Sequence, residues 1–139
     1  MEKDQRILVP LDGTDCGENI LPKVEELASN LRAGICLLRV TSAHTFPGAD
    51  PTEAEVKVVR EAEEYLRGLE DQLKAKGFDV DTHVRYGNEV EEILDHAAQK
   101  EIDLIAMSRG HTGVKHFLLG CVAEKVLRET PKPILLARC

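Results

Sequence analysis

The sequence lacks several features that would place it in a specialised class of protein. No apolar run approaches the roughly 20 residues needed to cross a bilayer, and the acidic N-terminal segment Met1–Arg6 has no signal-peptide pattern. Positive charge is scarce, because 18 lysines and arginines face 25 acids and the net charge is -7. This balance argues against general binding to nucleic acids or membranes, which are themselves polyanionic. We expect a cytoplasmic protein with one domain over residues 1–139.

Patterns for metal binding and disulfide bonding are missing too. The four cysteines, at positions 16, 36, 121 and 139, form no Cys-x-x-Cys, and three fall inside predicted helices or strands. This favours free thiols over a disulfide framework or a zinc site. The five histidines (44, 83, 96, 111 and 116) include no pair with metal-ligand spacing on one helix face, so no metal is assigned. A Gly-Lys-Ser/Thr phosphate loop is also absent, which makes ATP hydrolysis the least favoured function.

Short apolar runs alternate with amphipathic helical stretches along the whole chain. Residues 6–11, 35–41, 103–107 and 134–138 are typical of buried strands, and residues 79–86 alternate as an edge strand would. Helices with a 3.6-residue apolar stripe are predicted between them. Thr52 with Glu55, and Asn88 with Glu91, have capping-box spacing at two helix starts. Five strands alternating with four helices predict an α/β fold, a parallel sheet with helices on both faces.

Polar residues follow the first and fourth predicted strands. Asp12 and Gly13 come directly after the first strand, and Ser108 to Gly110 come after the fourth. Ligands of parallel α/β sheets bind at the carboxyl ends of the strands, where the strand order reverses. If these two strands are neighbours, a carboxylate faces a glycine loop across a crevice. Asp-Gly is also a common turn pair, and that role alone explains Asp12 equally well.

The loop after the fourth strand has the composition of an anion site. It bears Gly110 and Gly120, and a helical pattern begins at Cys121. Glycine allows close approach of backbone amides, and a helix N-terminus adds a positive dipole end. No acid occurs from Leu104 to Ala123, while Arg109 adds positive charge. An ordinary connection between a strand and a helix would show the same spacing, so the loop by itself is a weak motif.

Five segments together carry a family resemblance. They are Ile7–Thr14, Leu38–Val40, the pair Gly110 and Gly120 with nine residues between, Val122–Leu127, and Pro133–Arg138. In these segments the chain resembles the universal stress protein family over essentially its whole length. The resemblance implies a five-stranded parallel sheet in the order 3-2-1-4-5, a Rossmann-like fold of the adenine nucleotide alpha hydrolase type. It therefore implies that the first and fourth strands are neighbours.

The resemblance also implies a site for ATP or another adenine nucleotide. Asp12 would take the ribose and adenine side, a backbone group of Val40 would meet adenine, and Gly110 and Gly120 would hold phosphates. The full implied set is Pro10, Asp12, Val40, Met107, Arg109, Gly110, Gly120, Cys121 and Val122.

The chain departs from the family pattern at two positions of this site. The family's Met-Gly-Ser-Arg-Gly is Met107-Ser-Arg-Gly110 here, so the first glycine is either deleted or replaced by Met107, whose side chain would crowd the ribose. Cys121 stands where the family has Ser or Thr, and a thiol is a weaker phosphate donor. Losing one good hydrogen bond to a charged ligand costs about 1.5–3 kcal/mol. Binding is then weakened and not abolished.

Homodimers paired through the last strand are a further implication of the resemblance. The predicted interface is Pro133, Ile134, Leu135, Leu136, Ala137 and Arg138. An unpaired edge strand protected by Pro133 and Arg138 is the alternative.

Three functions are open: a non-catalytic or weakly catalytic stress-response dimer with a partly degenerate nucleotide pocket, a homodimer or heterodimer interaction module that binds no nucleotide, and a slow ATP hydrolase.

Overall fold

The computed structural model describes residues 5–42, 47–48, 50–109 and 118–138, and it confirms the predicted parallel sheet. The strands are β1 (Arg6–Leu11), β2 (Gly34–Thr41), β3 (Val80–Tyr86), β4 (Ile102–Ser108) and β5 (Ile134–Ala137). They lie in the order β3-β2-β1-β4-β5, and every pairing is parallel. The chain first builds outward from β1 to β3 and then returns to the other side of β1. The strand order therefore reverses between β1 and β4.

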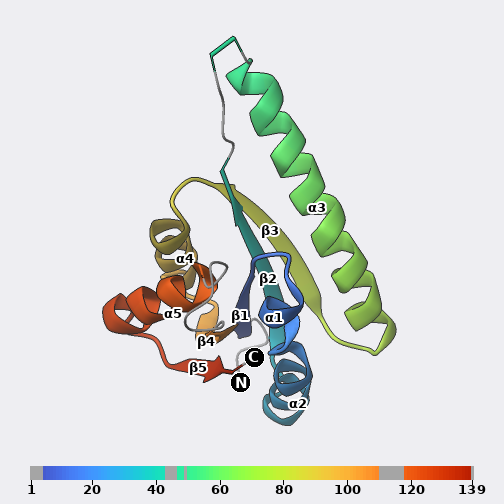
Figure 1. The fold of residues 1–139 in the computed structure, drawn as a ribbon. Helices are drawn as coiled ribbons and strands as arrows, with labels where there is room; N and C mark the ends of the chain where they lie inside the picture. Colours follow the sequence, from blue (N-terminus) through green and yellow to red (C-terminus); the bar gives the residue numbers. More distant parts are fainter. Residues whose placement is uncertain (1–4, 43–46, 49, 110–117, 139) are drawn as a thin grey trace.

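Helices cover both faces of this sheet (Figure 1). On one face α2 (Leu21–Leu31) and α3 (Pro51–Ala75) pack in a buried cluster with strand residues such as Val9 and Leu37. On the other face α4 (Glu89–Ala97) and α5 (Leu118–Glu129) pack in a second cluster with residues such as Leu8. Because neighbouring residues of one strand enter different clusters, the central strands are largely apolar.

The first predicted helix is two helices. A short α1 (Asp15–Glu18) precedes α2, which begins at Leu21 with Pro22 in its first turn. Proline has no amide hydrogen, so a continuous helix would lose the bond from residue 22 to Glu18. The break therefore falls at Asn19 and Ile20, so that Pro22 lies in the first turn of a new helix.

Side-chain caps set two of the helix starts. Asp50 accepts bonds from the amides of Thr52 (3.0 Å) and Glu53 (3.5 Å), and α3 begins at Pro51. The predicted start at Thr52 is therefore wrong, because a better cap lies two residues earlier. The predicted cap of α4 is confirmed: the Asn88 side chain accepts from the Glu91 amide at 3.0 Å.

The helix after the fourth strand begins earlier than its apolar pattern indicated. Its first residue is Leu118, so Gly120 lies in the first turn of α5 and not before it. Gly110 lies outside the described residues, and so does the side chain of Cys121. The prediction that Gly120 stands at the opening of a helix is confirmed.

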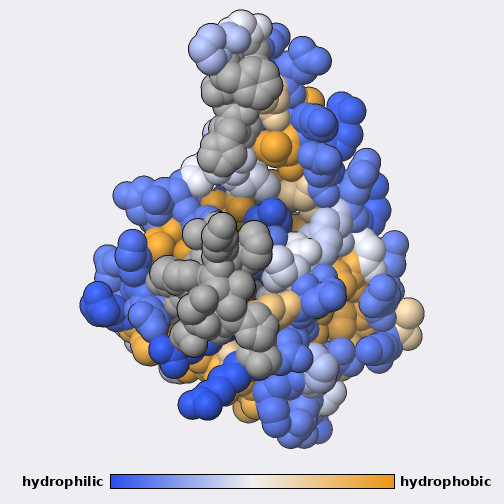
Figure 2. Space-filling view, viewed as in Figure 1, coloured by the Kyte–Doolittle hydropathy of each residue, from blue (hydrophilic) through white to orange (hydrophobic). Residues whose placement is uncertain are grey.

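The expectation of free thiols holds for only one of the described cysteines. Cys36 is free and buried, whereas Cys16 is disulfide-bonded. Cys139 lies outside the described residues. The surface in Figure 2 is mostly hydrophilic, with hydrophobic residues between the charged ones. Among the described residues, no helix has both the length and the apolar character of a membrane span.

A pair of leucines tests the assignment of the core. Leu37 is fully buried (0% exposed) in β2, whereas Leu31 at the end of α2 is 55% exposed. We expect Leu37→Ala to lower the free energy of unfolding by about 2–5 kcal/mol, because it leaves a cavity. The matched change Leu31→Ala should stay within about 0.5 kcal/mol of the parent. Urea unfolding followed by circular dichroism measures both, and equal effects would contradict the packing described.

Candidate functional site

The pairing of β1 with β4 brings two polar strand ends together. β1 ends at Leu11, directly before Asp12, and β4 ends at Ser108. The Ser108 hydroxyl is fully buried and donates to the Gly17 carbonyl of α1 at 3.3 Å. This bond ties the tip of β4 to the segment that follows β1. The two polar strand ends are therefore neighbours at the same edge of the sheet.

Asp12 organises the turn after β1. Its Oδ1 accepts bonds from the Thr14 amide (3.0 Å) and the Thr14 hydroxyl (2.6 Å). Thr14 in turn caps α1, because its hydroxyl oxygen accepts from the Gly17 amide at 3.0 Å. Gly13 has a φ of 85°, a conformation that favours glycine. The turn role of Asp12 is thus real, and Oδ2 is not used by it.

Gly17 is part of the same arrangement, although sequence reasoning missed it. A Cβ atom at Gly17 would lie 2.4 Å from Asp12 Oδ1. The carboxylate therefore occupies the space that any other side chain would need. The only sequence signal was a glycine within a predicted helix, where glycine costs stability and needs a packing reason.

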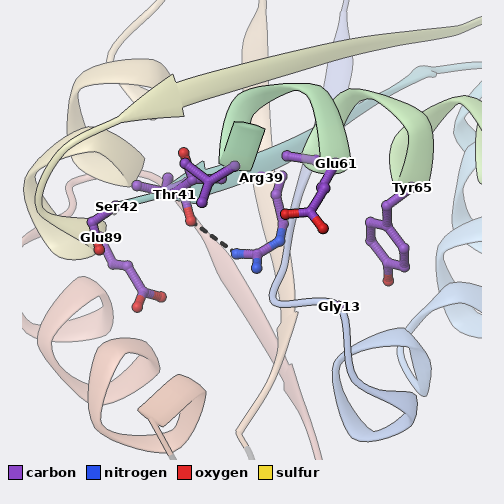
Figure 3. Close-up of a pocket in the computed structure, with 10 residues that line it drawn as sticks. Gly13, Arg39, Thr41, Ser42, Glu61, Tyr65 and Glu89 are labelled. Atoms are coloured by element: carbon purple, nitrogen blue, oxygen red, sulfur yellow. Dashed lines mark hydrogen bonds between the residues drawn. The ribbon is translucent and has the colours of Figure 1, made fainter. Parts of the chain in front are cut away.

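A cavity of about 350 Å³ opens beside this turn, at the carboxyl ends of β1 and β2 (Figure 3). This volume lies at the lower end of the range for small-molecule sites. Its walls come from the turn after β1, the end of β2, the middle of α3 and the start of α4. The lining residues are Gly13, Arg39, Val40, Thr41, Ser42, Val58, Glu61, Ala62, Tyr65 and Glu89.

Two polar groups at the end of β2, the Val40 carbonyl and the Thr41 hydroxyl, are candidates for hydrogen bonds with a ligand. The Val40 carbonyl accepts a bond from Nη1 of Arg39 at 2.8 Å. The Thr41 hydroxyl is buried and has no hydrogen-bond partner within the described part of the chain. Buried polar atoms of this kind are costly unless something binds them. Both residues line the cavity.

Charged side chains of both signs face the cavity. Arg39 from β2 and Glu61 from α3 point into it, and Glu89 lies toward its other end (Figure 3). Burial raises the pKa of Glu89, an effect that Arg39 opposes. Burial and a 2.5 Å hydrogen bond to Glu18 raise the pKa of Tyr65, so this phenol stays protonated and donates. Two carboxylates against one guanidinium make the cavity unsuited to a phosphate group.

The predicted site residues do not all meet at this cavity. Val40 lines it and Asp12 stands at its turn, while Pro10 is buried inside β1. Met107 is fully buried and packs with the α4 and α5 cluster. Our expectation that its side chain crowds the ribose is therefore wrong, because the strand directs it into the core.

The remaining site residues lie around the start of α5. Val122 is buried in this helix, and Gly120 and Cys121 belong to its first turn. Arg109 follows β4 and pairs with Glu124 of α5 at 2.8 Å, which offsets the positive charge that we had assigned to the loop.

The predicted dimer segment forms the other edge of the sheet. Residues Ile134–Ala137 form β5 and are partly buried, whereas Pro133 and Arg138 are exposed. The Pro133 and Ala137 carbonyls accept from β4, from the amides of Ile105 (3.0 Å) and Arg109 (2.7 Å). Alternate residues of a strand direct their backbone groups to opposite sides. The backbone groups of Ile134, Leu136 and Arg138 therefore face away from β4.

Comparison with known proteins agrees with this architecture. Residues 4–138 match the model of the universal stress protein family. The universal stress protein YxiE of Bacillus subtilis is 30% identical over 145 residues, which cover 96% of this chain and 98% of that protein. Among solved structures, the hypothetical protein MJ0577 of Methanocaldococcus jannaschii is 27% identical, with a TM-score of 0.83 over 99% of this chain and 98% of that one.

A more distant structural neighbour carries a ligand. The universal stress protein of Archaeoglobus fulgidus, solved in complex with dAMP, is 21% identical with a TM-score of 0.68. The match covers 95% of this chain and 96% of that protein. At this identity the likeness shows a common fold.

Two glycines test the role of Gly17. We expect Gly17→Ala to lower the free energy of unfolding by about 1–3 kcal/mol, because the new methyl displaces the Asp12 carboxylate from its bonds with Thr14. Gly68 in α3 is the control, since a Cβ there meets nothing within 4 Å. Gly68→Ala should raise stability by about 0.5–1 kcal/mol. Thermal and urea unfolding distinguish the two, and a stabilised Gly17→Ala protein would disprove the contact.

Proposed function

The chain belongs to the universal stress protein family, and from that premise we propose that it is a stress-response protein whose crevice binds an adenine nucleotide. The observation that carries the proposal is the cavity at the carboxyl ends of β1 and β2, next to the turn made by Asp12. In α/β sheets this is the position where ligands bind. The dAMP complex of the Archaeoglobus fulgidus neighbour supports the choice of ligand. The cytoplasmic location stays a prediction.

The cavity suits the base of the nucleotide. The exocyclic amine of adenine can donate to the Val40 carbonyl in place of Arg39. The Thr41 hydroxyl would gain the partner that it lacks among the described residues. Val58 and Ala62 supply apolar wall for the ring faces. An uncharged base also tolerates Glu61 and Glu89, which would repel a phosphate group.

The ribose and phosphates then extend toward β4. Asp12 Oδ2 is the acceptor available to ribose hydroxyls, because the turn uses Oδ1. Beyond it lies the tip of β4, tied to α1 by the Ser108 bond. The first turn of α5, with Gly120, directs its unpaired amides outward as every helix start does. The unpaired amides from Leu118 to Gly120 are the proposed phosphate contacts, because those of Cys121 and Val122, which the resemblance implied, are bonded within a helix that begins at Leu118.

Calorimetric titration with AMP, ADP and ATP tests this function. We expect binding by the parent protein, and at least about tenfold weaker binding by Asp12→Ala, since one charge-assisted hydrogen bond is worth about 1.5–3 kcal/mol. Asp71→Ala removes an exposed carboxylate of α3 and should leave affinity unchanged. Absence of heat at millimolar nucleotide would overturn the proposal and favour the interaction module instead.

We further propose that two copies pair through β5. This strand is an edge of the sheet, and the backbone groups of Ile134, Leu136 and Arg138 face away from β4. Such an edge is a template for another strand, and a two-fold axis would pair the two copies of β5 antiparallel. The family resemblance adds support for the homodimer.

Arg138 allows the pairing to be tested without disturbing the core, since its side chain is exposed. We expect Arg138→Pro to shift light scattering from dimer to monomer, because proline lacks the outward amide hydrogen. Arg138→Ala keeps that hydrogen and should remain dimeric. A monomeric parent protein, or a dimer in both variants, would contradict pairing through this edge.

A further inference from the structure

A cluster of metal-ligand side chains lies apart from the crevice. Cys36 of β2, His83 of β3 and His96 of α4, here called the Cys–His cluster, have one potential ligand atom each within 4.8 Å of one another. Cys36 Sγ lies 3.4 Å from His96 Nε2, and the two imidazole ring centres are 4.6 Å apart. Cys36 is near the start of β2, whereas the cavity begins at Arg39. None of the three cluster residues lines that cavity.

We propose that the Cys–His cluster binds a borderline-soft divalent transition metal, of which Zn²⁺ is the representative. One thiolate and two imidazoles are ligands that Zn²⁺ prefers. In a tetrahedral site, Zn–S of about 2.3 Å and Zn–N of about 2.0–2.1 Å place ligand atoms about 3.3–3.6 Å apart. The observed separations, from 3.4 Å to at most 4.8 Å, need only a small contraction.

The surroundings hold two of the ligands in place. His96 is 3% exposed and Cys36 is 1% exposed, so neither can turn toward solvent. His83 is 44% exposed at its side chain and can shift to complete the site. Its Nε2 is bonded to Asp81 at 2.7 Å, which leaves Nδ1 for a metal. A carboxylate bonded to the outer nitrogen is the usual support of a metal-ligating histidine.

The charges around the cluster are compatible with a bound cation. Arg6 is paired with Asp79 (3.0 Å) and Asp81 (3.1 Å), and Arg85 is paired with Glu92 at 3.0 Å. The neighbouring guanidinium groups are thus already balanced by carboxylates. A neutral imidazole is the form of His96 that binds metal. Binding exchanges the Cys36 thiol proton for the metal ion.

Arg85 opposes metal binding at His96, so a change at Arg85 should alter the affinity for the metal in a predictable direction. Its Nε donates to His96 Nδ1 at 3.0 Å, so the proton of the neutral ring is on Nε2, facing Cys36. Coordination through Nε2 requires the proton to move to Nδ1, and Arg85 must then withdraw toward Glu92. A glutamine at this position offers a carbonyl that accepts from the Nδ1 hydrogen. Arg85→Gln should therefore bind metal more tightly than the parent.

Cobalt provides the direct test, because Co²⁺ bound to a thiolate has a charge-transfer absorption band. We expect this band when Co²⁺ is added to the reduced full-length protein, and its loss when Zn²⁺ is added. Cys36→Ser should abolish it. Because that variant changes a buried residue, His83→Ala serves as a second one, and it should weaken Co²⁺ and Zn²⁺ binding at least about tenfold. Arg85→Gln should strengthen binding by a similar factor.

The control variant is Asp71→Ala, which removes an exposed carboxylate of α3 and should leave the band unchanged. Absence of a band in the parent protein, with no heat on titration with Zn²⁺, would overturn the inference. An equally strong band in Cys36→Ser or His83→Ala would also overturn it, because the metal would then be held elsewhere. These outcomes do not depend on whether the crevice binds a nucleotide.

Discussion

The parallel pairing of β1 with β4 is the constraint on which the rest of the crevice depends. The chain leaves β1 toward β2 on one side and returns to β4 on the other. The two connections therefore diverge at the carboxyl ends of the strands and leave space between them. The Asp12 turn and the tip of β4 lie at this reversal, and the Ser108 bond to Gly17 joins them. Without that pairing, each piece would be an ordinary loop.

Much of the fold was predictable, because the burial of central parallel strands produces largely apolar runs in the sequence. The first residues of the helices were harder to predict. Thr52 and Asn88 both had capping-box spacing, yet only Asn88 caps its helix, since Asp50 starts α3 earlier by accepting from the amides of Thr52 and Glu53. The break before α2 had a visible cause in Pro22. The predicted sheet order came from the family resemblance and not from periodicity.

The candidate site was predictable where it uses backbone and turns, and not where it uses side chains of distant elements. Val40 lines the cavity, and Asp12 directly precedes Gly13, which also lines it. Glu61 was missed because it lies on a long charged helix whose polar face reads as solvated, and Tyr65 because it belongs to the apolar stripe of that helix. Met107 was placed at the ligand, but an inward position in β4 puts it in the core. Arg39 is a charged residue within an apolar strand, and it was the one feature of the sequence that could have indicated this cavity.

His96 shows the limit of helical periodicity. It falls off the apolar stripe of its helix, yet it is buried because Arg85 and Cys36 provide partners for both ring nitrogens. Spacing on one helix face could not reveal a cluster assembled from β2, β3 and α4.

The cavity and the Cys–His cluster also differ in their chemical groups. The cavity has carboxylates and backbone acceptors at the carboxyl end of β2, whereas the cluster has a thiol and imidazoles near its start.

The central claim is that the crevice beside Asp12 holds an adenine nucleotide with its base at the end of β2 and its phosphate at α5. Amide chemical shifts in a ¹⁵N-labelled protein titrated with AMP measure this residue by residue. We expect saturable changes at Gly13, at Val40 to Ser42, and at Leu118 to Gly120. Saturation with AMP without changes at these amides, or with changes confined to other surfaces, would contradict it.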